Sequence, residues 1–570
     1  MNNYFNPNAA IIIYNYIDRQ GDYDLTEQTR DEIEEIILES EITSIQTQKS
    51  KSQPSGTFSF SLAPTKNWVT VLTPGSWLSI HMSNKKLKRE EKNKGGILSY
   101  GSKTLKMIGR IDSVQVAVIV NQETGARETS FTVSGRDWGQ VFESMIYMDP
   151  MASVSGDDGM GLAVRAGFDK LLVDTNKNNF STTSLINFFV DLWGSQTNSA
   201  KFKDSVRSLA GDKLNPNRLL PESVFYLPKE LHERFFFQGL QFGPNKPPTV
   251  AHNINIVPGK LQSYDDYTDP GESGGVPNVG AIVGGNSLWQ VLNAHCCSVV
   301  NELLTDLRWD QNRVMFTLYK RIRPFVLDKE ESTVNGKNVS SSFFYIRKTE
   351  INSDQVMSIQ AGTNWRDKIN FLEVLPQVGH LAPGLDGITP MTKSNQSNAA
   401  DYVSFGRDGF RPMLFSTPFF PYVGGKPAPL DGMYEWAPVL KKWYFNTHKM
   451  LNGVVIISNQ EDYIGVGENI ALEGSLFAAS FHIAGDTTKG KDIKVLAHVE
   501  SVTNAFSVSD YGARNFTTSV SFVRGVFTDK DCKELSNPDS YGIDSKASSL
   551  EDEAEKITNV YEVKDEQYNK

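Results

Sequence analysis

Two stretches of the chain, far apart in the sequence, alternate apolar and polar positions with a period of two. In the first, apolar residues alternate with serines over 58–62, and valines stand at every second position of 114–120. This alternation is typical of β-strands. Turn residues at 74–75 and 123–127 separate the runs. Residues 55–140 are therefore predicted to form an antiparallel β-domain.

The second stretch lies near the other end of the chain and repeats this design. Its strand-like runs are residues 453–457, 476–484, 494–508 and 516–522. Local landmarks match as well: Ile111-Asp112-Ser113-Val114 resembles Val499-Glu500-Ser501-Val502, Gly125-Ala126-Arg127 resembles Gly512-Ala513-Arg514, and Gly75 has a counterpart in Gly467. We therefore predict an internal duplication of one β-barrel domain.

The sequence between the two stretches has a mixed pattern. A helix is predicted over Thr183–Trp193, and residues 244–285 are rich in loop-forming proline and glycine. A second helix is predicted to begin near Ser287, followed by a hairpin whose turn is 309–312. Residues 376–438 are again rich in proline and glycine, and we expect them to be largely irregular. Such long, weakly patterned segments usually serve function or contact a partner.

These patterns predict an α+β, mainly β fold: two duplicated tube-type antiparallel β-barrel domains with mixed α/β domains between them. The predicted segments are an acidic N-terminal helical extension (1–50), a first tube-like β-barrel (51–150), a helical and loop-rich insert (151–285), a helix plus hairpin middle domain (286–375), a Pro/Gly-rich connecting segment (376–440), a second tube-like β-barrel (441–535) and an acidic C-terminal tail (536–570).

Charge is concentrated at the ends of this 570-residue chain, whose net charge is −10. Residues 18–45 hold ten acids and two arginines, and residues 537–570 hold nine acids and four lysines, so the remaining sequence is near +3. The first acidic stretch is predicted to be a helix, because Asp24 and Glu27 have the spacing of a capping box. It either packs on the body as a solvated helix or docks on a neighbouring subunit. The tail is expected to be mobile or ordered by a partner.

Composition narrows the class of protein. A mildly acidic chain with 39% hydrophobic residues is typical of a soluble protein, and an acidic balance disfavours a simple nucleic-acid binder. No run approaches the roughly 18 apolar residues of a membrane span. The apolar patch 9–14 has no basic residue before it, so a secretory signal is not expected. Three cysteines cannot form a disulfide framework, which favours assembly in a reducing compartment.

No motif predicts catalysis, a metal site or a cofactor. The segment 485–492 has the glycine and lysine spacing of a phosphate-binding loop, but Asp492 replaces the hydroxyl residue and a strand-like run follows. His295-Cys296-Cys297 lacks a second ligand pair at zinc spacing, and His232-Glu233 lacks the second histidine of a zinc protease. The acidic pairs at 157–158 and 265–266 lie in polar or glycine-rich loops.

One basic segment is a candidate contact surface. Residues 85–94 hold six cations and two anions between two predicted strands of the first barrel. A solvated hairpin loop is the simpler interpretation. The alternative is a subunit contact through Lys85, Lys86, Lys88 and Arg89, which would meet an acidic surface of a partner or the acidic ends of another copy of this chain.

Three parts of the chain together resemble one known family. The first part is the first barrel, which runs from Ser55-Gly56-Thr57 through Pro74-Gly75-Ser76-Trp77 and Gly109-Arg110-Ile111-Asp112 to Phe131-Thr132-Val133. The second is the central helix and hairpin, from Ser287-Leu288-Trp289 to Arg321-Ile322-Arg323-Pro324. The third is the second barrel, which ends at Val520-Ser521-Phe522-Val523. In this order they resemble the baseplate central hub proteins of contractile-tailed bacteriophages, which are similar to the N-terminal hub part of VgrG spike proteins.

The resemblance implies a structural role without enzymatic activity. It implies a homotrimer whose two tube domains per chain form a ring of six barrels, which joins the hexameric tail tube to the trimeric central spike and forms part of the DNA channel. The expected partners are the tail tube protein, the central spike protein, the tape-measure protein and other baseplate (wedge) proteins. DNA would pass through without specific binding. The protein would reside in the virion tail baseplate after assembly in the host cytoplasm, without stable membrane insertion.

Two other functions stay open at this point. One is a tail-associated cell-wall-degrading enzyme on a β-rich scaffold. The other is the tail-tip hub of a noncontractile tail, which would share the hub fold.

Overall fold

The protein is described from a computed structural model. The structure describes residues 7–16, 33–90, 99–120, 127–144, 255–256, 287–295, 301–310, 313–322, 332–334, 337–339, 348–376, 399–417, 422–423, 426–427, 444–458, 460–477, 493–509 and 511–528. The predicted helix 183–193, the loop-rich residues 257–285 and the acidic tail lie outside these ranges.

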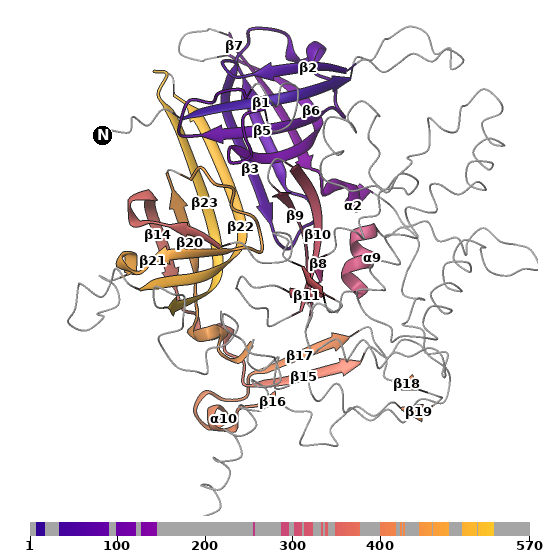
Figure 1. Cartoon of the computed structure of the whole chain (residues 1–570), viewed down its shortest axis with the longest axis vertical. Coiled ribbons are helices and arrows are strands. Elements are labelled where there is room, and N and C mark those ends of the chain that lie inside the picture. The colour runs from indigo at the N-terminus through magenta and orange to yellow at the C-terminus, as the bar shows by residue number, and fades with distance from the viewer. Residues whose placement is uncertain are drawn as a thin grey trace, which may run out of the picture.

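A large curled sheet dominates the described part, which is mainly β, as predicted (Figure 1). Its strands are β1 (Asn8–Tyr16), β2 (Ile33–Leu38), β3 (Ile42–Ser50), β4 (Thr57–Leu62), β5 (Trp77–Ser83), β6 (Leu105–Val120), β7 (Arg127–Asp137), β13 (Lys348–Ile351), β14 (Val356–Gly362), β20 (Leu451–Ile457), β21 (Asn469–Glu473), β22 (Lys494–Val508) and β23 (Arg514–Thr528). All of its pairings are antiparallel except the one between β13 and β21. The sheet is continuous, because β22 pairs with β3.

The same order of neighbouring strands occurs twice within this sheet. The first strand set has the order β3-β4-β7-β6-β5-β1, and the second strand set has the order β14-β20-β23-β22-β21-β13. The strands also follow one another along the chain in the same order in both sets. The sets differ at one pairing, since β1 is antiparallel to β5 whereas β13 is parallel to β21.

The matching landmarks of the sequence occupy matching places in the two sets. Gly75 and Gly467 both have positive φ angles, of 92° and 72°, which favour glycine. The Gly75 N–H donates to Ile111 O at 2.7 Å, and the Gly467 N–H donates to Val499 O at 2.9 Å. In each set the register of the long hairpin then shifts by one residue, at Asp112 and at Glu500. Each acid is therefore the extra residue of a β-bulge, which bends the strand there.

Each strand set has its own apolar core. The first core includes Ile11, Ile13, Phe60 and Leu78, and the second includes Val455, Ile470, Val499 and Val520. The end of the hairpin β22–β23 belongs to the first core, because Phe506 and Phe516 are buried there. Residues of the second set thus complete the core of the first, and Figure 1 shows this hairpin in yellow beside the indigo strands of the first set.

The predicted middle elements are confirmed. The helix α9 (Leu288–His295) is followed by the antiparallel hairpin of β9 (Asn301–Asp310) and β10 (Arg313–Ile322), in which Asp310 faces Arg313 across the turn. A short strand, β8 (Asn255–Ile256), pairs in parallel with β10. The ring of Trp289 in α9 meets Phe142 of the helix α2 (Gln140–Ser144) at 6.4 Å. The middle elements therefore pack on the first strand set.

A small α/β unit occupies part of the region that we predicted to be irregular. The strand β15 (Phe371–Pro376) pairs in parallel with β17 (Pro412–Thr417) and antiparallel with β16 (Ala399–Ala400), and α10 (Tyr402–Asp408) lies between β16 and β17 in the chain. The remaining short elements are α1 (Trp68–Val71), η6 (Ser353–Gln355), η7 (Trp365–Asp367), η8 (Thr447–Lys449), η9 (Gly474–Phe477), β11 (Ser332–Val334), β12 (Lys337–Val339), β18 (Tyr422–Val423) and β19 (Lys426–Pro427).

The structure corrects the prediction that residues 1–50 form a helical extension. Residues 33–38 are the strand β2, and residues 42–50 are the strand β3. Isoleucine favours strands, and β2 finds a partner in β1, so pairing overrides the helical spacing of its apolar residues. The predicted strand 476–484 is also shifted, since β21 ends at Glu473 and Leu476 lies in η9.

Other expectations about segments change too. The strands β13 and β14 pair with β21 and β20, so they belong to the second sheet region although they were predicted to be part of the middle domain 286–375. Likewise, β1 to β3 belong to the same sheet as β4 to β7. The two predicted barrels are regions of one continuous sheet, joined where β22 meets β3.

Candidate functional site

The first candidate surface is the contact between the two strand sets, which we call the seam and define as the pairing of β22 with β3. Its register runs from Ser501 opposite Ser50 to Ser507 opposite Ser44. A buried polar group crosses it: the Asn504 amide donates to Thr47 Oγ1 at 3.2 Å, and the Thr518 hydroxyl donates to Asn504 Oδ1 at 2.9 Å. Because these polar groups satisfy one another, they can be buried at low cost.

Charged residues are buried near one end of the seam. Lys49 of β3 forms an ion pair with Asp137 at the end of β7, and both side chains are almost fully buried. Burial raises the pKa of Asp137, against the opposing effect of Lys49 and of the N–H groups that donate to its carboxylate. Lys49 also lies 5.5 Å from the centre of the Trp138 ring. This pair joins β3 to the end of β7 within the first strand set.

The strand β9 of the middle hairpin enters the same region. Lys51 lies between Glu302 of β9, at 2.8 Å, and Glu500 of β22. His498 of β22 faces the same Glu302 at 3.6 Å. Elsewhere on β9, the Thr305 hydroxyl donates to Pro54 O, and Asp306 accepts a hydrogen bond from the Tyr463 hydroxyl. The middle hairpin is therefore attached to both strand sets at the seam.

Three lysines of the first strand set hold a loop of the second. The buried Lys106 ammonium donates to the carbonyls of 460–462, the shortest contact being 3.0 Å to Glu461 O. Burial lowers the pKa of Lys106 to about 8, against the opposing effect of Asp462 and Glu461. On the surface, Lys85 meets the Glu461 carboxylate at 3.0 Å and Lys103 meets Asp462 at 3.3 Å.

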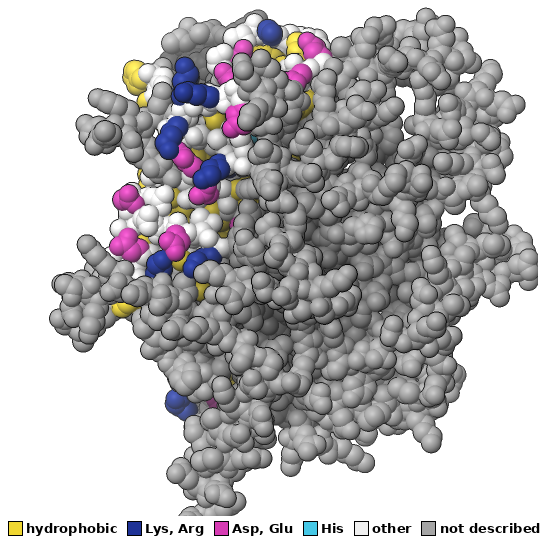
Figure 2. Space-filling view, in the orientation of Figure 1, with side chains coloured by type: hydrophobic (Ala, Val, Ile, Leu, Met, Phe, Trp, Pro, Cys, Tyr) yellow, Lys and Arg dark blue, Asp and Glu magenta, His cyan; other side chains and the backbone are white. Residues whose placement is uncertain are grey.

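The four basic residues that the sequence suggests as a subunit contact all lie in the described part of the chain. Lys85 pairs with Glu461 of the second strand set, and Arg89 pairs with Glu35 of β2 at 2.6 Å. Lys86 and Lys88 are exposed. The structure thus brings the basic segment to the acidic N-terminal region of its own chain. Figure 2 shows Lys and Arg side chains next to Asp and Glu side chains over the described part of one face.

The second candidate surface is the far end of the hairpin β6–β7, which we call the free edge and define as residues 113–119 of β6. The strand β7 pairs with one side of these residues, and β5 pairs only with residues 105–110 of β6, so no strand of the described part of the chain pairs with their other side. Val116, Val118 and Val120 are 50%, 58% and 54% exposed. The sequence shows apolar residues on both faces of this strand, which was the available signal of a covered surface.

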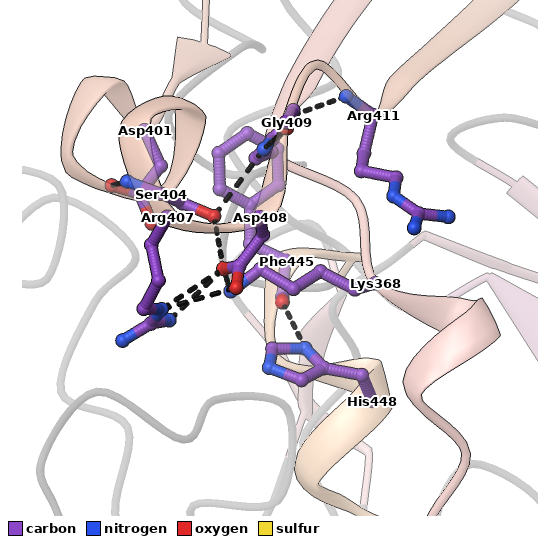
Figure 3. Close-up of polar contacts among 10 residues, drawn as sticks. Lys368, Asp401, Ser404, Arg407, Asp408, Gly409, Arg411, Phe445 and His448 are labelled. Carbon is purple, nitrogen blue, oxygen red and sulfur yellow. Dashed lines mark hydrogen bonds and ion pairs between the residues drawn. The ribbon is translucent and has the colours of Figure 1, made fainter.

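A polar cluster in the small α/β unit is the third candidate (Figure 3). The Asp408 carboxylate accepts hydrogen bonds from Arg407 and Ser404 and meets Lys368 at 2.7 Å. Hydrogen bonds from Arg407 and Lys368 hold the pKa of Asp408 below its usual range. The His448 imidazole instead donates from Nδ1 to Phe445 O at 2.9 Å.

This cluster has the features of a structural network. The Ser404 hydroxyl donates to Asp408 and accepts from the Asn370 amide at 3.3 Å. Asp401 caps α10 by accepting from the Ser404 N–H. The guanidinium of Arg411 stacks 3.9 Å from the Trp365 ring. Burial lowers the pKa of His448, and this imidazole contacts the Phe445 carbonyl rather than the serine. The carboxylate that Ser404 contacts, Asp408, is itself held by Lys368 and Arg407.

The described residues contain no group of three or more His, Cys, Asp or Glu side chains suited to a metal ion. In the same part of the chain, no helix combines the length and apolar character of a membrane span. The segment 485–492, the cysteines, His232-Glu233 and the acidic pairs at 157–158 and 265–266 lie outside the described residues.

Comparison with known proteins gives structural matches only. No family model matches the chain, and no curated protein sequence matches it. Among solved structures, it is similar to the 43 kDa tail protein of prophage MuSo2 from Shewanella oneidensis, at 9% identity and a TM-score of 0.37, over 91% of this chain and 98% of the other.

Two further matches have the same character. A tail protein from Neisseria meningitidis MC58 matches at 8% identity and a TM-score of 0.37, over 90% of this chain and 96% of the other. A Francisella PdpA-VgrG complex matches at 8% identity and a TM-score of 0.35, over 94% of this chain and 54% of the other. The chain therefore has structural matches among phage tail proteins and VgrG proteins over about nine tenths of its length.

Proposed function

We propose that this chain is a structural, non-enzymatic hub of a phage tail baseplate, which assembles as a homotrimer between the hexameric tail tube and the trimeric central spike. The observation that carries the proposal is the repeated strand order, β3-β4-β7-β6-β5-β1 and β14-β20-β23-β22-β21-β13. With the matching bulges and glycines, it supports a duplication of one domain.

A duplicated domain suits an adaptor between two symmetries. Three chains would present six similar strand sets, so one face of the ring could meet six tube subunits while the three middle hairpins meet the spike. The attachment of β9 to both strand sets supports a fixed relation between these two parts. In this role the ring surrounds part of the DNA channel, and the tape-measure and wedge proteins contact it within the virion baseplate.

The basic segment has a place in this proposal. Lys85, Lys86, Lys88 and Arg89 contribute to a subunit contact, in which the exposed Lys86 and Lys88 meet an acidic surface of the next subunit. Reversing all four charges should weaken assembly and reduce its dependence on salt. Assembly that stays intact and insensitive to salt would remove this contact from the account.

The proposal is tested by native mass. The purified 63.5 kDa chain should form a complex of three copies, alone or when mixed with the spike protein of its own tail, measured by native mass spectrometry. A chain that stays monomeric at every concentration and in the presence of the spike contradicts the hub. Hydrolysis of peptidoglycan that a single Asp or Glu substitution abolishes would replace it by the cell-wall enzyme.

A further inference from the structure

The two long hairpins occupy equivalent places in the strand sets, yet among the described strands only the end of β22–β23 has a further strand paired with it. Aligning the two sets by their bulges makes Val116, Val118 and Val120 the counterparts of Asn504, Phe506 and Val508. Phe506 is 4% exposed and Val508 packs on the first core, whereas the three valines are at least half exposed. The strand that covers β22 at this place is β3.

The counterpart of β3 in the second strand set is β14. Both strands pair with the equivalent neighbour, β4 in one set and β20 in the other. The strand β14 ends the large sheet, so its other edge has no partner among the described strands. Within the described part, the molecule therefore has two complementary open edges: residues 113–119 of β6 lack a β3-like strand, and β14 lacks a β22-like strand.

These two edges do not meet within the described sheet, where six strands lie between β14 and β6. We propose that the free edge of β6 pairs antiparallel with β14 of a second copy, which repeats the seam between subunits. This inference rests on the proposed function, since it names the surfaces through which the hub closes into a ring.

The register of the contact follows from the seam. Phe506 lies opposite Ile45 in the seam, and the equivalent residues are Val118 and Ile359. The new contact therefore places Val118 opposite Ile359 of the next copy. The neighbouring pair is Val116 opposite Ala361, where the seam has Asn504 opposite Thr47.

The chemistry of the two edges fits this pairing. Residues 113–120 of β6 (SVQVAVIV) and the whole of β14 (VMSIQAG) contain no charged residue. An uncharged, apolar strand edge invites pairing with another chain, and proteins usually protect such edges with charges. The strand β2, at the opposite end of the sheet, carries Glu34 and Glu35 and is protected in this way.

The buried polar group of the seam is replaced by apolar residues at the equivalent positions of the proposed contact. Its members Asn504, Thr47 and Thr518 correspond to Val116, Ala361 and Phe131. Burial of an all-apolar group in a contact between copies stabilises the association of the subunits. The contact is also head-to-tail, so it generates a closed ring rather than a two-fold dimer when the rotation closes.

Disulfide cross-linking tests the register. In a background with Cys296, Cys297 and Cys532 changed to alanine, the double variant Val118→Cys and Ile359→Cys should form intermolecular disulfides under mild oxidation. Opposed Cα atoms in antiparallel strands lie roughly 4.5–5.5 Å apart, which is within disulfide range. Cross-linked dimers and trimers should appear on a non-reducing gel.

Matched variants separate the possible outcomes. Each single cysteine variant, and the pair Val118→Cys with Ser358→Cys, should give at least several-fold less cross-linking, because Ser358 points to the other face of its strand. If native mass shows a trimer but the Val118–Ile359 pair does not cross-link above these controls, the edge pairing is wrong and the hub still stands. If no trimer forms at all, the proposed function itself fails.

A second variant tests the contact without cross-linking. Val118→Glu should weaken trimer formation by roughly tenfold or more, because the carboxylate would be buried at the new contact, while the melting temperature of the dissociated chain stays unchanged. The matched control is Val403→Glu, on an equally exposed valine of α10 that lies at neither edge. Equal assembly of the two variants would overturn the inference.

Discussion

The hairpins β6–β7 and β22–β23 have the same position in their strand sets and the same bulge, but opposite surroundings. The end of β22–β23 is buried, because β3 pairs with it and the first core receives Phe506 and Phe516. The end of β6–β7 carries three valines into solvent. The comparison shows that the same hairpin is covered at one site and open at the other within the described part of the chain.

The two hairpins also differ in how they meet their partners. The filled site uses a buried amide and two hydroxyls, those of Asn504, Thr47 and Thr518, which satisfy one another. The open site has only apolar side chains at the equivalent places. Buried polar groups specify a register within one chain, whereas apolar groups supply the free energy of association that a contact between separate chains needs.

The largest expected contrast is between the equivalent residues Phe506 and Val118. Phe506→Ala removes a buried ring from the first core and should lower the free energy of unfolding by about 3–5 kcal/mol. Val118→Ala should change that of the dissociated chain by less than about 0.5 kcal/mol. Urea unfolding of both variants measures the contrast, and equal losses would show that the free edge is already covered within the chain.

The buried pair at the seam should have a similarly large effect. Asp137→Asn leaves the Lys49 ammonium buried without its carboxylate and should cost about 3–5 kcal/mol of stability. Changing both residues, Lys49→Met with Asp137→Leu, should cost clearly less, because no charge is then buried alone. A double-mutant cycle by denaturant unfolding gives the coupling. Additive losses would mean that the pair does not hold β3 to β7.

Lys106 should give the contact between the sets a dependence on pH. Its pKa is lowered from 10.5 to about 8 in the folded protein, so between these values the unfolded chain binds the proton and the folded chain does not. Stability should therefore rise with pH from about 8 to 10.5 through this residue. The free energy of unfolding of the unsubstituted chain minus that of Lys106→Met should be larger at pH 9.5 than at pH 7.5. A constant difference would contradict the lowered pKa.

The smallest effect is expected for the surface lysines of the same contact. Lys85 is 74% exposed in its pair with Glu461, so Lys85→Ala should cost roughly 0–1 kcal/mol and less at high salt. Lys103→Ala, removing the pair with Asp462, should behave alike. A loss as large as that of Asp137→Asn would show that these exposed pairs, rather than the buried groups, join the two strand sets.

The sequence predicts the strands in which apolar and polar residues alternate. The alternation over 58–62 and 114–120 and the turn at 309–312 all correspond to observed elements. The match of Asp112 with Glu500 also corresponds to an observed feature, since each residue is the extra residue of a β-bulge. A bulge involves only a few neighbouring residues, so a local sequence match can reveal it.

One strand that the sequence does not reveal, β3, has polar as well as apolar residues at its buried positions. In β3 the buried positions include Thr47 and Lys49, which become acceptable only because Asn504 and Asp137 lie opposite them. Those partners are 457 and 88 residues away in sequence, so no local pattern reports them. For the same reason β2 was predicted as a helix: its partner β1 decides its structure. The exposure of the free edge is also a property of the whole sheet, and the sequence shows only its apolar composition.

The central claim is that the free edge of β6 repeats the seam between subunits. A cryo-electron microscopy map of the assembled ring tests it most directly, by showing which strand lies beside residues 113–119. The account predicts β14 of the neighbouring copy, antiparallel, with Val118 opposite its Ile359. A ring in which this edge remains exposed to solvent, or pairs with a strand other than β14, would contradict it.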